Sequence, residues 1–225
     1  MAEANSGWRK TTTIFFIIFV FTFAYALLRY NILRSVPIDQ IPLYITNKAV
    51  ALTATILIGL SFLLGPLAHF WPKKFEHQLY LRKYLGVYGF GIAALHAIMS
   101  LMLFSPSYYP RYFDTTTGKM TLGGESAILF GILAILVFAA IAVTSLPSIE
   151  EKMQPAQWKS VQRLGYLAYF LVLLHVGIMG YKGWLNPESY SFGLISISLI
   201  TALFIIFVFI LRTLVIIFPF HSASK

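Results

Sequence analysis

Six long apolar runs constrain the fold of this chain more than any other feature. Each is close to the ~20 residues that a helix needs to cross a bilayer. They cover about residues 11–28, 45–68, 84–104, 123–146, 161–181 and 191–218. With 58% hydrophobic and 11% charged residues, the chain is too apolar for an ordinary soluble domain. The sequence therefore predicts an all-α, polytopic membrane protein: one six-transmembrane-helix bundle in a single domain over residues 1–225.

The first run has a second interpretation. The tripeptide Ala24-Tyr25-Ala26 resembles a cleavage site, so a signal peptide is the alternative to a retained first span.

The distribution of basic residues predicts the orientation in the membrane. The net charge is +9, and most lysines and arginines flank apolar runs, which favours membrane lipid over nucleic acid as their partner. With six spans, the side that carries both termini holds 11 of the 17 lysines and arginines. The positive-inside rule then places both termini in the cytoplasm, and we expect a bacterial-type inner (plasma) membrane.

Two histidines occupy matching contexts inside apolar runs. His96 follows Leu85-Gly86 and His175 follows Leu164-Gly165; in both cases eight residues and a leucine intervene. A titratable side chain within hydrocarbon is costly, so each histidine is a functional-site hypothesis. Cysteine is absent from the sequence, which excludes disulfides, thiolate chemistry and iron–sulfur ligation.

The spacing predicts that His96 and His175 lie at one depth. Each comes ten residues after its glycine, or ~15 Å along a helix, and the third and fifth spans run in the same direction. We therefore predict that the two imidazoles are the axial metal ligands of one haem b. Gly89 and Ala93, on the same face of the third span as His96, leave room beside that helix for a flat macrocycle.

A structural interpretation of the same residues stays open. Small residues on one helix face are the usual signature of helix packing, and intramembrane histidines can form hydrogen bonds across a bundle or relay protons. The chain would then be a non-redox small transporter or scaffold. Metal transport is less favoured, because neither histidine-bearing span contains Asp or Glu.

Several short stretches, taken in order, resemble the ferric reductase-like transmembrane domain family. They span residues 45–182 and are Gly65-Pro66-Leu67, Leu81-Arg82-Lys83-Tyr84-Leu85-Gly86, Leu95-His96, Thr144-Ser145, Trp158, Arg163-Leu164-Gly165-Tyr166 and Leu174-His175. The resemblance is greatest to the branch that contains MsrQ-type haem-binding membrane subunits. It implies a b-type cytochrome that transfers electrons to an extracytoplasmic acceptor or a partner reductase, as one subunit of an oxidoreductase system.

One departure from the family bears on the number of haems. Members often carry a further histidine about thirteen residues before the one in the fifth span, where this chain has Gln162; the equivalent place in the third span is Lys83. Neither residue is a usual haem ligand, so we predict one haem. Recruitment of His69 or His77 to a second haem is the alternative.

The electron donor and acceptor are left open by the sequence. No Rossmann glycine pattern is present, so electrons are expected from a membrane quinol or from a flavin such as FMN, supplied with a partner flavoprotein. The basic cluster Lys73, Lys74, Arg82 and Lys83 suits a flavin phosphate or an acidic partner, although anionic lipid explains it equally. A sulfoxide reductase, ferric iron and oxygen are the possible acceptors.

The haem propionates also need partners. Arg29, Arg34 or Arg111, on the side opposite the termini, is expected to pair with them.

Overall fold

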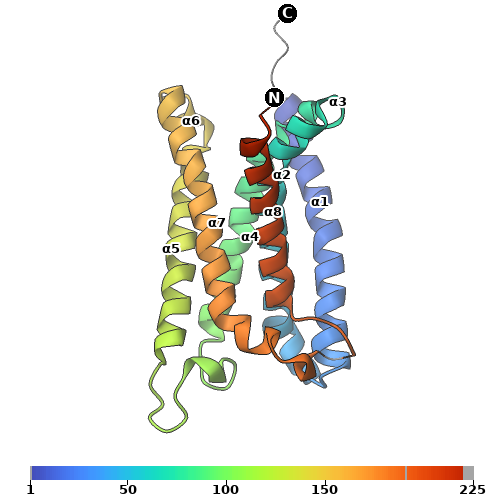
Figure 1. Cartoon of the computed structure of the whole chain (residues 1–225), viewed down its shortest axis with the longest axis vertical. Helices are drawn as coiled ribbons and strands as arrows, with labels where there is room; N and C mark the ends of the chain where they lie inside the picture. Colours follow the sequence, from blue (N-terminus) through green and yellow to red (C-terminus); the bar gives the residue numbers. More distant parts are fainter. Residues whose placement is uncertain (1, 191, 220–225) are drawn as a thin grey trace, which may run out of the picture.

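Six long helices stand side by side in the computed structural model, which describes residues 2–190 and 192–219 (Figure 1). No β-strand occurs in these ranges, so the all-α prediction is confirmed. The long helices are α1 (Ala2–Ala26), α2 (Thr46–Phe70), α4 (Leu81–Met102), α5 (Leu122–Thr144), α7 (Pro155–Trp184) and α8 (Ile197–Ile217). Two short helices, α3 (Pro72–Phe75) and α6 (Pro147–Glu150), lie in the connections.

All six predicted spans are present, and each helix is long and apolar enough to cross a membrane. Their ends differ from the sequence prediction by a few residues. Helix α7 begins at Pro155, six residues early, because proline fits the first turn, where a backbone N–H has no helical partner. Helix α8 begins only after Ser196, whose hydroxyl accepts the N–H of Leu199 as an N-cap, so the predicted start at residue 191 was too early.

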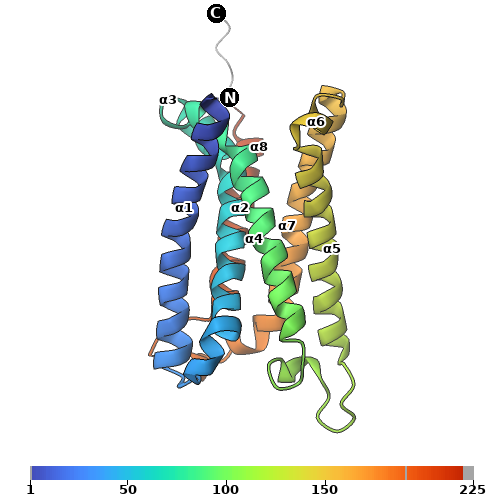
Figure 2. The same ribbon diagram turned by 180° about the vertical axis from the view of Figure 1, so that it is seen from behind.

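The start of α1 and the end of α8 lie at the same end of the bundle, together with α3 and α6 (Figures 1 and 2). We call this the terminal end, and the opposite one the far end. A side-chain contact links two helix ends there: His69 Nε2, on α2, lies 3.0 Å from the carbonyl oxygen of Phe218. This arrangement agrees with an even number of crossings.

Helix α2 is the central helix of the bundle. In its most apolar stretch 72% of the residues are buried, whereas in each of the other five spans at most 22% are. It packs against α1, α4 and α8, and the hydroxyl of Tyr169 on α7 donates to the Thr55 carbonyl of α2 at 3.0 Å. Residues of α2 are therefore placed to meet side chains from several other spans.

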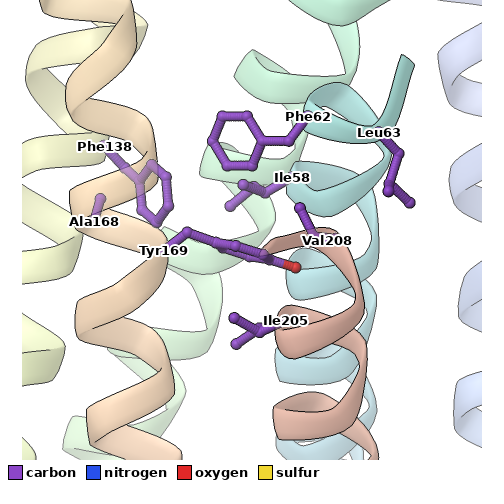
Figure 3. Packing of buried hydrophobic residues seen from close by; sticks show 8 residues of the cluster. All are labelled: Ile58, Phe62, Leu63, Phe138, Ala168, Tyr169, Ile205 and Val208. Atoms are coloured by element: carbon purple, nitrogen blue, oxygen red, sulfur yellow. The ribbon is translucent and has the colours of Figure 1, made fainter. Parts of the chain in front are cut away.

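A buried apolar cluster joins α2 to α5, α7 and α8 (Figure 3). Its members are Ile58, Phe62, Leu63, Phe138, Ala168, Tyr169, Ile205 and Val208. Close approach of α7 depends on Gly165, because a methyl group at that position would lie 2.8 Å from the ring of Phe62. Since α4 and α7 both pack on α2, this core fixes the positions of His96 and His175 relative to each other.

Candidate functional site

His96 is held by a polar side chain of the central helix. Its Nδ1 lies 2.7 Å from Oδ1 of Asn47, in the first turn of α2. The amide nitrogen of Asn47 donates to the Ser100 hydroxyl at 3.0 Å, which leaves Oδ1 as the acceptor for His96. The proton of this imidazole therefore sits on Nδ1, and Nε2 carries the free lone pair.

His175 is held by the backbone of α5. Its Nδ1 lies 2.7 Å from the carbonyl oxygen of Ala127. A carbonyl can only accept, so His175 also carries its proton on Nδ1. Gly131 lies against the same ring: a methyl group at this position would be 3.1 Å from Nδ1 of His175. The absence of a side chain at Gly131 thus lets α5 lie close to the imidazole.

Both histidines lie in the far half of the bundle, His96 on α4 and His175 on α7. No group of three or more His, Cys, Asp or Glu side chains that could hold a metal ion occurs among the described residues. Any metal held here would therefore depend on the two imidazoles and on ligands that it brings with it.

The small-residue face of α4 packs against α2. A methyl group at Gly89 would lie 2.7 Å from the Ile58 side chain and 3.1 Å from its backbone nitrogen. One at Gly86 would lie 3.4 Å from the Ser61 hydroxyl, and Ala93 packs against the buried cluster that contains Ile58. These small residues have the helix-packing role that was the alternative interpretation; a place for Gly89 and Ala93 beside a cofactor stays a prediction.

Two cations at the far end lie close to the same aromatic ring, that of Tyr30. Arg29 is 1% exposed, and its Nε donates to the carbonyl of Leu194 at 3.2 Å. Lys48, which follows Asn47 on α2, has its Nζ 5.0 Å from the centre of the Tyr30 ring, and the Arg29 guanidinium carbon lies 5.0 Å from that same centre. Arg29 was predicted from the sequence to lie at this end; Lys48 was not.

Arg34 and Arg111 are the other two arginines expected to pair with haem propionates, and both are exposed. Their roles beside a cofactor stay predictions.

Two stacked tyrosines from the connection between α4 and α5 reach this site. The Tyr109 and Tyr112 ring centres are 5.5 Å apart, and the Tyr109 hydroxyl lies 3.5 Å from the amide nitrogen of Asn47. Tyr112 is 7% exposed, and its hydroxyl has no hydrogen-bond partner among the described residues. Burial raises the pKa of Tyr112 far above its ordinary value, so this hydroxyl remains protonated.

A separate cavity of about 660 Å³ opens in the terminal half of the bundle, between α4 and α7. Both Lys83 and Gln162 line it, so the structure brings together the two positions at which the sequence departs from the family pattern. Lys83 forms an ion pair with Glu150 of α6, and the Gln162 amide donates to the Ser145 hydroxyl at 3.1 Å. The charged residues that line the cavity are Arg82, Lys83, Glu150, Lys159, Arg163 and Arg212.

The basic cluster predicted from the sequence divides in two. Arg82 and Lys83 line this cavity, whereas Lys73 and Lys74 lie on the exposed helix α3 and do not. Neither His69 nor His77 is among the described lining residues. Recruitment of either histidine to a second haem in this cavity therefore has no support from the geometry.

Residues 50–173 match the protein family described as "Ferric reductase like transmembrane component". The chain belongs to this family. His96 lies inside the matched range, and His175 lies two residues beyond it. With six apolar helices and this membership, the protein is an integral, multi-pass membrane protein.

Curated relatives match most of the chain at low identity. Metalloreductase STEAP2 of Homo sapiens is 27% identical over 216 residues, which is 82% of this chain and 44% of that protein. Metalloreductase STEAP3 of Rattus norvegicus is 26% identical over 218 residues, with 83% and 44% covered. The chain thus spans less than half the length of these relatives. The family resemblance predicted from the sequence is confirmed, and the MsrQ-type subgroup stays a prediction.

Proposed function

We propose that this protein is a b-type cytochrome subunit that holds one haem between His96 and His175 and transfers electrons to an extracytoplasmic acceptor. The observation that carries this proposal is the hydrogen bonding of the two imidazoles. Each donates its Nδ1 proton over 2.7 Å to a fixed oxygen, of Asn47 in one case and Ala127 in the other. Hydrogen bonds of this kind orient an imidazole so that Nε2 can bind a metal.

The donor set fits a haem. Two neutral imidazoles are a recognised axial pair, and no thiolate is available because the sequence contains no cysteine. When bound, haem iron would supply one-electron chemistry, and His96 and His175 together would leave no open place on it for a substrate. The protein's contribution is to set the tautomer of each histidine and to exclude water with the apolar residues of α4, α5 and α7.

Electron entry is best placed at the terminal-half cavity. Its charged lining has five cations and one carboxylate, and Lys83 is already paired with that carboxylate. An excess of positive charge beside the aromatic ring of Tyr166 suits an anionic, flat electron carrier such as FMN, or the head group of a quinol. The partner that supplies the electrons would be a flavoprotein or a quinol-generating system.

Our proposal for the acceptor states its location, on the extracytoplasmic side, and leaves two candidates for its identity. The curated relatives carry the name metalloreductase, which favours a metal ion such as ferric iron. The resemblance to MsrQ-type subunits favours a partner reductase instead. With both termini in the cytoplasm of an inner membrane, as the charge distribution predicts, the histidine pair lies in the outer half of the bilayer, nearer to either acceptor.

Substitution of the ligands tests the proposal. His96→Ala and His175→Ala should each abolish the reduced-minus-oxidised haem spectrum of the purified protein, while His77→Ala, on an exposed turn, should leave it unchanged. Membrane insertion and monodispersity in detergent serve as folding controls. A full haem spectrum in His175→Ala would disprove the assignment, and colourless wild-type protein from haem-replete cells would favour the non-redox transporter or scaffold.

A further inference from the structure

The side-chain amide of Asn47, the partner of His96, has a partner for each of its polar groups. Asn47 is 2% exposed, so these groups depend on the protein rather than on water. Its Oδ1 accepts the Nδ1 proton of His96 over 2.7 Å. Its amide nitrogen carries two protons and lies 3.0 Å from the Ser100 hydroxyl and 3.5 Å from the Tyr109 hydroxyl. Both N–H groups and the oxygen are therefore paired in this orientation.

The opposite orientation of the same amide would leave one group unpaired. Turned over, Asn47 would present its oxygen to the two hydroxyls and its nitrogen to His96. Among the described residues, Nδ1 of His96 is the one group within hydrogen-bond distance on that side, so the second N–H would have no acceptor. A buried N–H without an acceptor is costly, so the first orientation is preferred.

The orientation of this amide decides which nitrogen of His96 can bind a metal. In the preferred orientation Asn47 accepts from Nδ1, and Nε2 keeps its lone pair. In the opposite orientation Asn47 would donate to Nδ1, and a neutral imidazole that accepts there carries its proton on Nε2. Haem iron would then meet a protonated nitrogen.

The preference depends on both hydroxyls. If either Ser100 or Tyr109 lost its hydroxyl, each orientation of the Asn47 amide would leave one N–H unpaired, and the difference between the two orientations would shrink. Ser100 lies one turn after His96 on α4, whereas Tyr109 belongs to the connection between α4 and α5. A loop residue thus acts on a histidine in the bundle.

The start of α5 fixes the position of Tyr109. The Tyr109 ring stacks on Tyr112, with the ring centres 5.5 Å apart, and Tyr112 is 7% exposed. The Tyr112 carbonyl accepts the N–H of Thr121, the N-cap residue of α5, at 2.7 Å. A methyl group at Gly124, in the first turn of α5, would lie 2.7 Å from that carbonyl oxygen, so the tyrosine pair is packed tightly on this helix.

We propose that Tyr109 and Ser100 are positioning residues for His96. By accepting the two N–H groups of Asn47, their hydroxyls keep its oxygen on Nδ1 of His96 and leave Nε2 free for haem iron. The consequence for haem rests on the proposed function. The tautomer of His96 does not, because it can be measured without haem.

Nitrogen nuclear magnetic resonance of isotope-labelled histidine reports the tautomer directly, since protonated and unprotonated ring nitrogens have well-separated shifts. Full-length protein is purified in detergent from cells that cannot make haem, at a pH at which imidazoles are neutral. The signals of His96 are those that disappear in His96→Gln. The variants are Tyr109→Phe and Ser100→Ala. Tyr108→Phe is the matched control, because this neighbouring tyrosine packs against Tyr44 instead.

In the wild type, His96 should carry its proton on Nδ1. Tyr109→Phe should raise the ratio of Nε2-protonated to Nδ1-protonated imidazole at least about fivefold, the change expected for one lost hydrogen bond. Tyr108→Phe should match the wild type. An unchanged ratio in folded Tyr109→Phe would overturn the proposal, as would a wild-type His96 protonated on Nε2. If Tyr109→Phe does not fold, the same change in Ser100→Ala decides.

Haem loss separates this inference from the proposed function. Haem-loaded Tyr109→Phe should transfer its haem to apomyoglobin at least about fivefold faster than the wild type, and Tyr108→Phe at the wild-type rate. If the wild type binds no haem, the proposed function fails, while a shifted tautomer ratio in Tyr109→Phe would still support the positioning role. A shifted ratio with wild-type haem loss would overturn the connection to haem.

Discussion

Nδ1 of His96 on α4 lies 2.7 Å from the side-chain oxygen of Asn47 on α2. His175 makes a bond of the same length to a main-chain carbonyl, that of Ala127 on α5. The two imidazoles are thus oriented by acceptors of different kinds. Only the partner of His96 can be removed by a side-chain substitution, so the two halves of the site can be perturbed independently.

Asn47→Leu removes the close acceptor for His96 and leaves its N–H with only the Ser100 hydroxyl, 3.5 Å away. Loss of a hydrogen-bond partner of a metal-binding histidine typically weakens metal binding by roughly 10- to 100-fold, so we expect faster haem loss and a shifted reduction potential. Asn47→Asp should restore retention and lower the potential, because a carboxylate makes the imidazole a stronger donor. Thr55→Val, which removes a different polar group from α2, is the control. Unchanged haem retention in Asn47→Leu would contradict the assigned role.

Gly131 gives a test of His175 that leaves its hydrogen-bond acceptor intact. In Gly131→Ala the new methyl group would lie 3.1 Å from Nδ1 of the imidazole, so the ring must move by a few tenths of an ångström. We expect an altered low-spin haem signal in electron paramagnetic resonance, and a larger change in Gly131→Val. Gly177→Ala on α7 is the matched control, since nothing lies within 4 Å of a methyl group there. Identical spectra for Gly131→Ala and wild type would show that His175 is not constrained at this point.

The terminal-half cavity should accept a second haem if ligands are supplied. Lys83 and Gln162 both line this cavity of about 660 Å³. We expect the double variant Lys83→His/Gln162→His to raise the haem content from one towards two per chain. Each single substitution should leave it at one, because one imidazole supplies only half of the axial pair. A haem content of one in the folded double variant would contradict this use of the cavity.

The connection between α4 and α5 should loosen in acid. Asp114 Oδ1 accepts hydrogen bonds from the Thr117 N–H, the Thr117 hydroxyl and the Thr116 N–H, which hold the pKa of this exposed carboxyl below its ordinary value of 3.8. A lowered folded-state pKa stabilises the turn above that ordinary value, and the effect is lost as the pH falls through the folded-state pKa. Limited proteolysis with an acid protease should therefore cleave residues 114–119 faster below about pH 4.

Asp114→Asn should remove this pH dependence, since an amide does not titrate in that range. A wild-type cleavage rate that does not change with pH, measured against a control site elsewhere in the chain, would contradict the turn's dependence on the carboxylate.

The long helices were predictable because apolar length alone identifies a span. The matching heights of His96 and His175, which follow from their shared ten-residue spacing after glycine, stay a prediction. Helix ends were less accurate, because Pro155 and Ser196 act through capping geometry rather than hydropathy. These local signals were present in the sequence but were outweighed by the apolar pattern.

The partners of the histidines could not be predicted, because they depend on which helix occupies the centre. Asn47 precedes His96 by 49 residues and reads as a polar residue at the start of an apolar run. Only the central position of α2 brings it to α4. The same packing gives Gly89 a role against Ile58, where periodicity alone indicated a cofactor face.

The most direct test of the central claim is the visible spectrum of the purified protein, dithionite-reduced minus oxidised, with haem quantified per chain. The account predicts a low-spin b-type signal at one haem per chain, lost in both His96→Ala and His175→Ala. A haem signal that survives removal of either histidine, or wild-type protein without haem from cells able to supply it, would contradict the account.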